Sequence, residues 1–406
     1  RWQLFAQNYK NVEVYLLTPA KVDWYATKEY TFSGAETVYG KVIDEENFHI
    51  RLFRLNFFGW SWFSTDYKKI FKEIQPDLIY HVGTHRMLSL IQVAMVSHRV
   101  CPKAKLAFFS MRGPASNLKL DKSKCRPKEW LKRRFRYILL KQTWNYVRKN
   151  FDAIFCHYPD AVACFRLEGY EGPLYMQTQV GVNEEWFHED VEARHEIRKK
   201  YDIGDSTYVF GSASRFSADK GIDVILKALP ADGDWKYLMM GTGSEEDLKR
   251  LRAIINERNL SEKVIETGFV DWFEMAKYWN AVDCAIHVPL TTPEWVETFS
   301  LAVIQPQITK KPVIGDDSGS VPYQIGFDDM IVPEGNVEAL HNKIEWVLNH
   351  KEKASAIGLK MYKRTHDCFE VKHLNSMFYD TIVEDVQKGK YDENKHDMTK
   401  YTPKSI

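Results

Sequence analysis

Short β-rich runs alternate with amphipathic helical stretches along this chain, and this alternation limits the possible folds more than any other feature. In the first half, the runs lie at 11–19, 77–83, 105–113 and 152–157. Strands that alternate with helices form a parallel sheet with crossover helices on its faces. The segment from Lys128 to Asn150 contains neither Gly nor Pro and repeats apolar residues at a helical period. We therefore expect an α/β fold.

A second alternating set begins at Tyr208, after a charged, loop-like stretch at 181–207. Its strand-like runs lie at 208–215, 236–243, 263–270, 283–290 and 312–319. A length of 406 residues suits two domains of ordinary size, and we expect two Rossmann-like, doubly wound halves. The predicted organisation is an N-terminal domain at 1–190, a C-terminal domain at 191–371, a helix at 372–388 that crosses back to the first domain, and a polar tail at 389–406.

Composition argues against several classes of protein. Lys and Arg number 56 against 55 Asp and Glu, a balance that speaks against a nucleic-acid partner. The six cysteines show neither metal-ligand spacing nor a disulfide framework, which indicates a reducing, cytoplasmic environment. No apolar stretch approaches the roughly 18 to 20 residues of a membrane span, so we expect a soluble or peripheral protein. The chain opens at Arg1 in helical text, and we expect a strand and its Gly-rich loop upstream of it.

The segment 211–221, GSASRFSADKG, follows a predicted strand and opens a predicted helix. Backbone amides at a helix start, together with the cations of Arg215 and Lys220, favour a bound phosphate. An ordinary solvated loop explains these residues equally well when they are taken alone. The turn Gly241-Thr-Gly243 after the next strand is similar, since a tight turn needs such glycines with or without a ligand.

In chain order these segments resemble the donor half of the retaining glycosyltransferases of family 4, which have the GT-B fold. The resemblance covers most of 208–350. It rests on Arg215 and Lys220 at the family spacing, on the Gly-x-Gly turn, and on the stretch from Glu297 to Gln305. It implies that Arg215 and Lys220 stabilise the diphosphate as a leaving group, and that Glu297 faces the transferred sugar. A surface acid near a helix start is the alternative explanation of Glu297.

The same resemblance implies a wider set of donor-binding residues: Gly211, Ser214, Gly241, Gly243, Phe269, Val270, Thr298, Phe299, Ser300, Leu301 and Gln305. The backbone near Phe269 and Val270 would contact the base. Gln305 stands where the family has a second glutamate that holds the ribose hydroxyls, and an amide can still hydrogen-bond ribose without charge assistance. Pro306 follows directly and predicts a non-helical Gln305 and a shortened helix.

The first half of the chain matches the family more loosely. Arg112 stands where many members have a histidine, and it can stabilise charge but cannot act as a base. A structural salt bridge explains Arg112 equally well. His81 and His157 lie near predicted strand ends and are candidates for ligand contact at the cleft that the GT-B fold implies, although such histidines are more often structural.

The segment from Lys128 to Lys149 mixes basic and aromatic residues. It could touch an anionic membrane or a lipid-diphosphate acceptor, while a solvated helix face is the more frequent explanation. No spacing suggests a metal site, and we expect no built-in cofactor, since the nucleoside-diphosphate sugar is the donor substrate. The acceptor, a glycan or a lipid-linked molecule, and the oligomeric state stay open.

The sequence thus predicts a glycosyltransferase that moves a hexosyl unit from a nucleoside-diphosphate sugar to a hydroxyl acceptor with retention of configuration. Two alternatives stay open. One is a catalytically silent, sugar-nucleotide-binding subunit of a glycosyltransferase complex, suggested by Gln305 and Arg112. The other is a sugar-nucleotide epimerase on a related two-domain scaffold, for which the expected acids and histidine cannot be assigned.

Overall fold

The computed structural model describes residues 1–20, 42–54, 56–58, 61–83, 87–110, 127–292 and 295–391. The chain divides into two compact units. The first comprises Arg1–Gln179 and the C-terminal part from Asn375, and the second comprises Val180–Leu374. The second unit therefore begins earlier in the chain than residue 191, where we expected it.

The second unit is built on a six-stranded sheet in which every neighbouring pair is parallel. The strands are β10 (Tyr208–Ala213), β11 (Trp235–Met240), β12 (Val264–Gly268), β13 (Cys284–His287), β14 (Val313–Asp316) and β15 (Ile331–Val332). Their spatial order is β12-β11-β10-β13-β14-β15. Numbered from β10, this order is that of the Rossmann fold.

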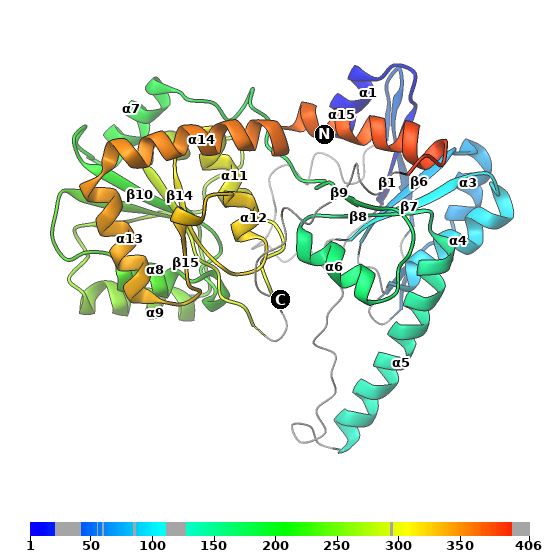
Figure 1. The fold of residues 1–406 in the computed structure, drawn as a ribbon, viewed down its shortest axis with the longest axis horizontal. Coiled ribbons are helices and arrows are strands. Elements are labelled where there is room, and N and C mark those ends of the chain that lie inside the picture. The colour runs from blue at the N-terminus through cyan, green and yellow to red at the C-terminus, as the bar shows by residue number, and fades with distance from the viewer. Residues whose placement is uncertain are drawn as a thin grey trace. The chain divides into compact units, whose positions relative to one another are not determined.

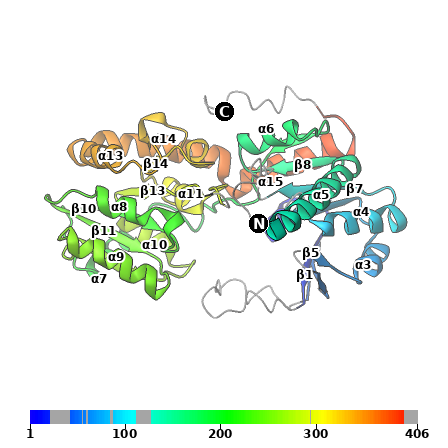
Figure 2. The ribbon, with the colours of Figure 1, turned by 90° about the horizontal axis from the view of Figure 1, so that it is seen from below.

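Helices cover both faces of this sheet (Figures 1 and 2). They are α7 (Val191–Lys200), α8 (Ile222–Ala228), α9 (Glu245–Glu257), α10 (Met275–Ala281), α11 (Leu301–Ile308), α12 (Val321–Ile325), α13 (Val337–Asn349) and α14 (Lys351–Phe369), with 3-10 turns at Ala218–Lys220 and Asp328–Met330. Because both faces are covered, most residues of the inner strands are apolar, and Phe210, Leu238 and Ile286 are buried.

Helix α11 includes both Gln305 and Pro306 and ends at Ile308, so the expectation of a non-helical Gln305 is wrong. Proline removes the hydrogen bond that its N–H would give to the carbonyl one turn earlier. Val303, Ile304 and Ile308 on this helix are fully buried in the core of the unit. Burial of these side chains outweighs the lost hydrogen bond.

The first unit contains a parallel four-stranded sheet in chain order: β6 (Leu78–Gly83), β7 (Lys105–Ser110), β8 (Ala153–Cys156) and β9 (Leu174–Met176). A second sheet pairs β1 (Val14–Pro19) in parallel with β3 (Phe48–Phe53), which pairs antiparallel with β2 (Ile43–Asp44). A separate hairpin joins β4 (Asn56–Phe58) to β5 (Ser61–Phe63). The runs predicted at 11–19, 77–83, 105–113 and 152–157 thus contain β1, β6, β7 and β8.

The helices of the first unit are α1 (Trp2–Asn8), α3 (Tyr67–Ile74), α4 (Leu88–Val100), α5 (Pro127–Asn150), α6 (Pro159–Leu167) and, from Asn375 onward, α15 (Val371–Asp380) with a π-helical turn at Thr381–Gln387. Aromatic rings fix α15 in this unit. Phe378 packs with ring centroids 5.0 Å from Tyr80 and 5.6 Å from Phe155. The predicted α/β fold of two Rossmann-like units is confirmed. Among the described helices, none combines the length and apolarity needed to cross a bilayer.

Two glycines let neighbouring loops of the second unit approach backbone to backbone. Gly221 has φ +68°, and a Cβ there would lie 1.8 Å from the carbonyl oxygen of Val288. Gly241 has φ +137°, and its Cβ would lie 1.9 Å from the carbonyl oxygen of Ser214. Both glycines sit where loops leave the carboxyl ends of the strands, so any side chain would push these loops apart.

Two substitutions, Gly221→Ala and Gly268→Ala, separate the cost of this close approach from the cost of the left-handed backbone conformation. Gly268 also has positive φ, +72°, but nothing lies within 4 Å of the position of its Cβ. We expect Gly268→Ala to cost about 1 kcal/mol of unfolding free energy for the left-handed backbone alone. Gly221→Ala should cost about 1 to 3 kcal/mol more, because the loop must also move. Urea unfolding of both variants measures the difference, and equal losses would contradict the packing argument.

Asp316 at the end of β14 is an acid inside the core. It is 0% exposed, and its Oδ1 accepts a hydrogen bond of 2.8 Å from Ser318 Oγ. Its Oδ2 has no hydrogen-bond partner among the described residues. Burial raises the pKa of Asp316 to about 7, against a smaller lowering effect of Ser318. The folded state therefore holds a proton that the unfolded state releases near pH 4.

Stability should therefore fall as the pH rises from about 4 to 7, since the folded state binds the extra proton in this window. Asparagine mimics the protonated acid. We expect Asp316→Asn to match the wild type near pH 4 and to exceed it by about 2 to 4 kcal/mol at pH 8, measured by urea unfolding. Asp329→Asn, at an exposed aspartate, is the control. A difference that does not change with pH would contradict the shifted pKa.

Candidate functional site

The strand order of the second unit has a switch point between β10 and β13. The chain leaves β10 toward β11 on one side, and it leaves β13 toward β14 on the other. The loops that follow β10 and β13 therefore part above the carboxyl ends of these two adjacent strands. In open α/β sheets, ligands bind in the crevice at such a switch point.

Three charged or titratable side chains meet at this place. Lys220 Nζ lies 3.5 Å from Glu297 Oε2, and His287 Nε2 lies 3.5 Å from the same oxygen. Glu297 is only 8% exposed. Lys220 Nζ also lies 3.6 Å from the ring centroid of Trp295, in cation–π geometry. The structure thus joins two residues predicted from the sequence, Lys220 and Glu297, with two that were not.

His287 and Trp295 were missed for different reasons. His287 ends β13 and is a polar residue in an apolar run, which is a signal that could have been noticed. Trp295 lies in a loop, where an aromatic residue carries no positional pattern. Its role depends on the approach of Lys220, which comes from another element.

Glu297 is a carboxylate at neutral pH. Burial alone would raise its pKa, but His287 and Lys220 together outweigh burial and hold the pKa of Glu297 below the ordinary value. A buried carboxylate beside a lysine can orient a polar ligand and balance positive charge. It is poorly suited to donate a proton, because it holds none near pH 7.

The loop between β10 and α8 carries further polar groups. Arg215 is exposed. The hydroxyl oxygens of Ser214 and Ser217 are buried and have no hydrogen-bond partner among the described residues. Buried hydroxyls normally find partners, so this loop has polar groups available to a ligand. The backbone is held in place, since Ser214 N donates to Met240 O at 3.1 Å.

The remaining predicted donor residues mostly serve packing through their side chains. A Cβ at Gly211 would lie 2.5 Å from Val282 Cγ2, and one at Gly243 would lie 2.9 Å from the Phe216 Cβ. The Phe299 ring packs edge-on to Phe369 at 5.5 Å. Thr298 and Leu301 are half-buried, and Ser300 and Val270 are buried.

Two of the predicted donor residues have a clear structural setting: Phe269 is exposed, and Ser300 is held through its backbone. The Phe269 side chain is 63% exposed at the end of β12, where it is open to a ligand. Ser300 is fixed through its backbone, because its N–H donates to Gln324 Oε1 at 2.8 Å and its carbonyl accepts from Gln324 Nε2 at 2.9 Å. The segment from Glu297 to α11 is therefore firmly held.

Gln305 lies in α11 and is 3% exposed. Its Oε1 accepts a hydrogen bond of 3.1 Å from Trp279 Nε1. Its Nε2 has no partner in the described part of the chain. The amide oxygen is thus used inside the unit, which leaves the buried amide nitrogen as the polar atom of this side chain without a partner among the described residues.

Three further candidates belong to the first unit. Arg112 lies outside the described residues. His81 Nε2 lies 3.4 Å from Ser89 Oγ, and desolvation lowers the pKa of His81 to about 4, so its imidazole is neutral at pH 7. His157 is buried, with Nδ1 3.1 Å from Thr178 Oγ1. Across the described ranges, no three His, Cys, Asp or Glu side chains are placed to hold a metal ion.

Comparison with known protein families matches the second unit, and comparison with curated proteins matches less than half of the chain. Residues 193–364 match the family model described as glycosyl transferases group 1. A GDP-mannose-dependent alpha-(1-6)-phosphatidylinositol monomannoside mannosyltransferase of Mycobacterium tuberculosis is 26% identical over 188 residues, 44% of this chain and 48% of that protein. A GDP-mannose-dependent monoacylated alpha-(1-6)-phosphatidylinositol monomannoside mannosyltransferase of Corynebacterium glutamicum is 28% identical over 176 residues, 41% of this chain and 45% of that protein. The chain spans about half the length of these curated relatives.

Two solved structures share the fold over most of the chain. Anabaena Alr3699/HepE in complex with UDP and glucose superposes with a TM-score of 0.61 over 84% of this chain and 87% of its own, at 16% identity. Sucrose-phosphate synthase from Thermosynechococcus elongatus superposes with a TM-score of 0.63 over 91% of this chain and 97% of its own, at 15% identity. The chain therefore has the GT-B fold of two Rossmann-like units, and its residues 193–364 carry a domain of the glycosyl transferases group 1 type.

Proposed function

We propose that this protein transfers a hexosyl unit from a nucleoside-diphosphate sugar to a hydroxyl group of an acceptor. The observation that carries the proposal is the meeting of Lys220, Glu297 and His287 at the switch point of the second unit. A loop with buried hydroxyls that have no partner among the described residues begins directly after β10. The match of residues 193–364 to the group 1 family supports it.

The proposed chemistry follows from the charges of Arg215, Lys220 and Glu297, which lie in loops after the carboxyl ends of β10 and β13. The bond between the sugar C1 and the diphosphate oxygen breaks, and negative charge builds on the leaving phosphate. Lys220 and Arg215 stabilise that charge, which lowers the barrier to departure. Glu297 stays ionised and faces the sugar, where positive charge develops as the leaving group departs.

We propose that configuration is retained. The acceptor oxygen attacks C1 from the face that the diphosphate leaves, and the leaving phosphate oxygen takes the acceptor proton. This course needs no separate base, which agrees with a Glu297 whose Oε2 already lies 3.5 Å from both Lys220 Nζ and His287 Nε2. Water must be excluded, because hydrolysis competes with transfer.

GDP-mannose is the donor that we propose to test first, since the curated relatives named above use it according to their names. The ribose would meet Gln305 through its unpaired Nε2. For the acceptor we propose a lipid-linked molecule. On α5, Phe135 and Ile138 are 70% and 48% exposed on a helix rich in Lys and Arg, which suits contact with an anionic membrane surface.

The direct test is release of the nucleoside diphosphate from a panel of guanosine, uridine and adenosine diphosphate sugars, with mixed lipid acceptors. We expect release from one donor. Arg215→Ala and Lys220→Met should each reduce it about 100-fold or more, because each removes charge stabilisation of the leaving group. Lys227→Met, at an exposed lysine of α8, is the matched control and should keep wild-type activity.

The panel also separates the alternatives. Donor binding by calorimetry without release, even with acceptors present, would favour a catalytically silent sugar-nucleotide-binding subunit. Absence of donor binding would overturn the proposal altogether.

A second prediction concerns the pH profile. His287 is one of the two groups that lower the pKa of Glu297, so His287→Ala should raise that pKa. If activity requires ionised Glu297, the acid limb of the kcat/KM profile should move to higher pH. His341→Ala, at a half-buried histidine of α13, is the control. An unmoved acid limb in His287→Ala would mean that Glu297 does not govern it.

A further inference from the structure

A polar pocket lies at the amino ends of the strands of the same sheet, opposite the carboxyl ends that carry the candidate donor residues. Its volume is about 380 Å³, and its lining includes Tyr208, Asp283 and Lys311. These residues stand at or just before the amino ends of β10, β13 and β14. The candidate donor residues follow the carboxyl ends of β10 and β13, so the two sites are distinct.

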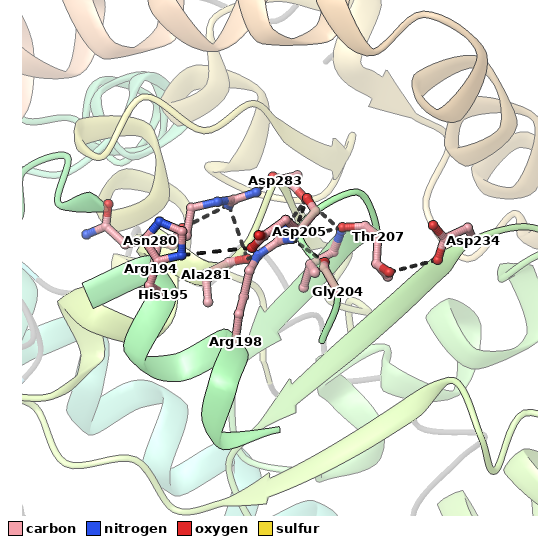
Figure 3. A network of polar contacts seen from close by, with 11 residues as sticks. Arg194, His195, Arg198, Gly204, Asp205, Thr207, Asp234, Asn280, Ala281 and Asp283 are labelled. Carbon is pink, nitrogen blue, oxygen red and sulfur yellow. Dashed lines mark hydrogen bonds and ion pairs between the residues drawn. The ribbon is translucent and has the colours of Figure 1, made fainter. Parts of the chain in front are cut away.

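The floor of the pocket is a closed network (Figure 3). Asp283 accepts from Arg194 at 2.7 Å through Oδ1 and from Arg198 at 2.6 Å through Oδ2. Arg198 is 2% exposed and also donates to the carbonyl oxygens of Gly204 and Thr207 at 3.0 Å. Two guanidinium groups thus share one carboxylate, which leaves a net positive charge beneath the pocket.

Lys311 stands next to this network without a counter-ion. Its Nζ has no hydrogen bond or ion pair with the described residues, whereas neighbouring Lys310 pairs with Glu189 at 2.7 Å. Burial, together with repulsion from Arg194, lowers the pKa of Lys311, against weaker attraction from Asp283 and Glu189. Lys311 is half-buried, and an ammonium group partly withdrawn from water is stabilised by an anion beside it.

Helix α14 adds a second cation and a helix start. Lys351, its first residue, lies over the Tyr208 ring at 5.3 Å from the centroid and lines the pocket with Glu352 and Ser355. The first turn of this 19-residue helix offers backbone N–H groups and the positive end of the helix dipole. Of the lining carboxylates, Asp283 is paired with two arginines and Glu189 with Lys310, while Asp205 and Glu352 are on exposed residues, so none of the four pairs with Lys311.

The turn that carries Lys311 is strained. Lys310 has φ +64°, a conformation that glycine adopts far more readily. A Cβ at Gly358 would lie 2.6 Å from Lys310 O, so α14 packs tightly on this turn. Strain of this kind persists where the surrounding structure holds a functional geometry in place.

We propose that this pocket binds a small phosphate-bearing anion, with Lys311, Lys351 and the first turn of α14 around the phosphate group. The volume exceeds that of a phosphate ion, so a phosphorylated metabolite fits it as well as inorganic phosphate. The proposal goes beyond the transferase activity and does not depend on it.

The test measures the Tm of the full chain with inorganic phosphate and, in a second arm, with a hexose 6-phosphate, each at constant ionic strength in chloride. At a ligand concentration about fivefold above the dissociation constant, we expect the Tm to rise by roughly 2 to 4 °C. Lys311→Met should abolish the rise, and Lys311→Arg should keep it. Lys353→Met, at an exposed lysine of α14 that does not line the pocket, should behave as the wild type.

Arg215→Ala separates this pocket from the donor site, because phosphate also suits the diphosphate position. A rise that persists in Arg215→Ala and disappears in Lys311→Met supports the proposal. A rise lost in Arg215→Ala and kept in Lys311→Met, or no rise with either ligand, overturns it. A larger rise with the hexose phosphate than with phosphate identifies a metabolite, and equal rises identify the free ion.

Discussion

The parallel pairing of β10 with β13 is the contact on which the candidate donor site depends. Phe210 and Gly211 of β10 pair with Cys284 and Ala285 of β13, although more than 70 residues separate them. The pairing brings the loop with Lys220 beside the loop with Glu297. Leu290 N then donates to Asp219 O at 2.8 Å and ties the two loops together. Without this register, the cation and the carboxylate would belong to unrelated surfaces.

The charged groups at the carboxyl ends of the strands are arranged differently from those at the amino ends. At the carboxyl edge, Glu297 has Lys220 and His287 around one oxygen, and its pKa is lowered. At the amino edge, Asp283 is saturated by two arginines, and Lys311 is left without a partner. At the carboxyl ends, the Glu297 carboxylate is placed to bind a ligand. At the amino ends, Lys311 has no ion pair with the described residues and is placed to bind an anion. The apolar core of the second unit lies between these two groups of charges and keeps them apart.

Much of this architecture could be predicted from the sequence. The strands at the runs 208–215, 236–243 and 312–319 were expected, because short β-rich runs that alternate with helical stretches form a parallel sheet. The short strands β2, β4 and β5 were not, since two or three residues carry no readable period. The helical conformation at Gln305 was also missed, because the local preference against helix before proline is weaker than the burial of α11.

The sequence by itself determined the α/β class, the division into two halves, and the loop residues Arg215, Lys220 and Glu297 as a candidate anion and sugar site. Tertiary structure alone decided that His287 and Trp295 join them, that the Gln305 oxygen is used by Trp279, and that Lys311 faces a pocket. The reason is physical. Periodicity reports which face of an element is buried, whereas contacts between distant elements depend on strand order and register, which no local pattern encodes.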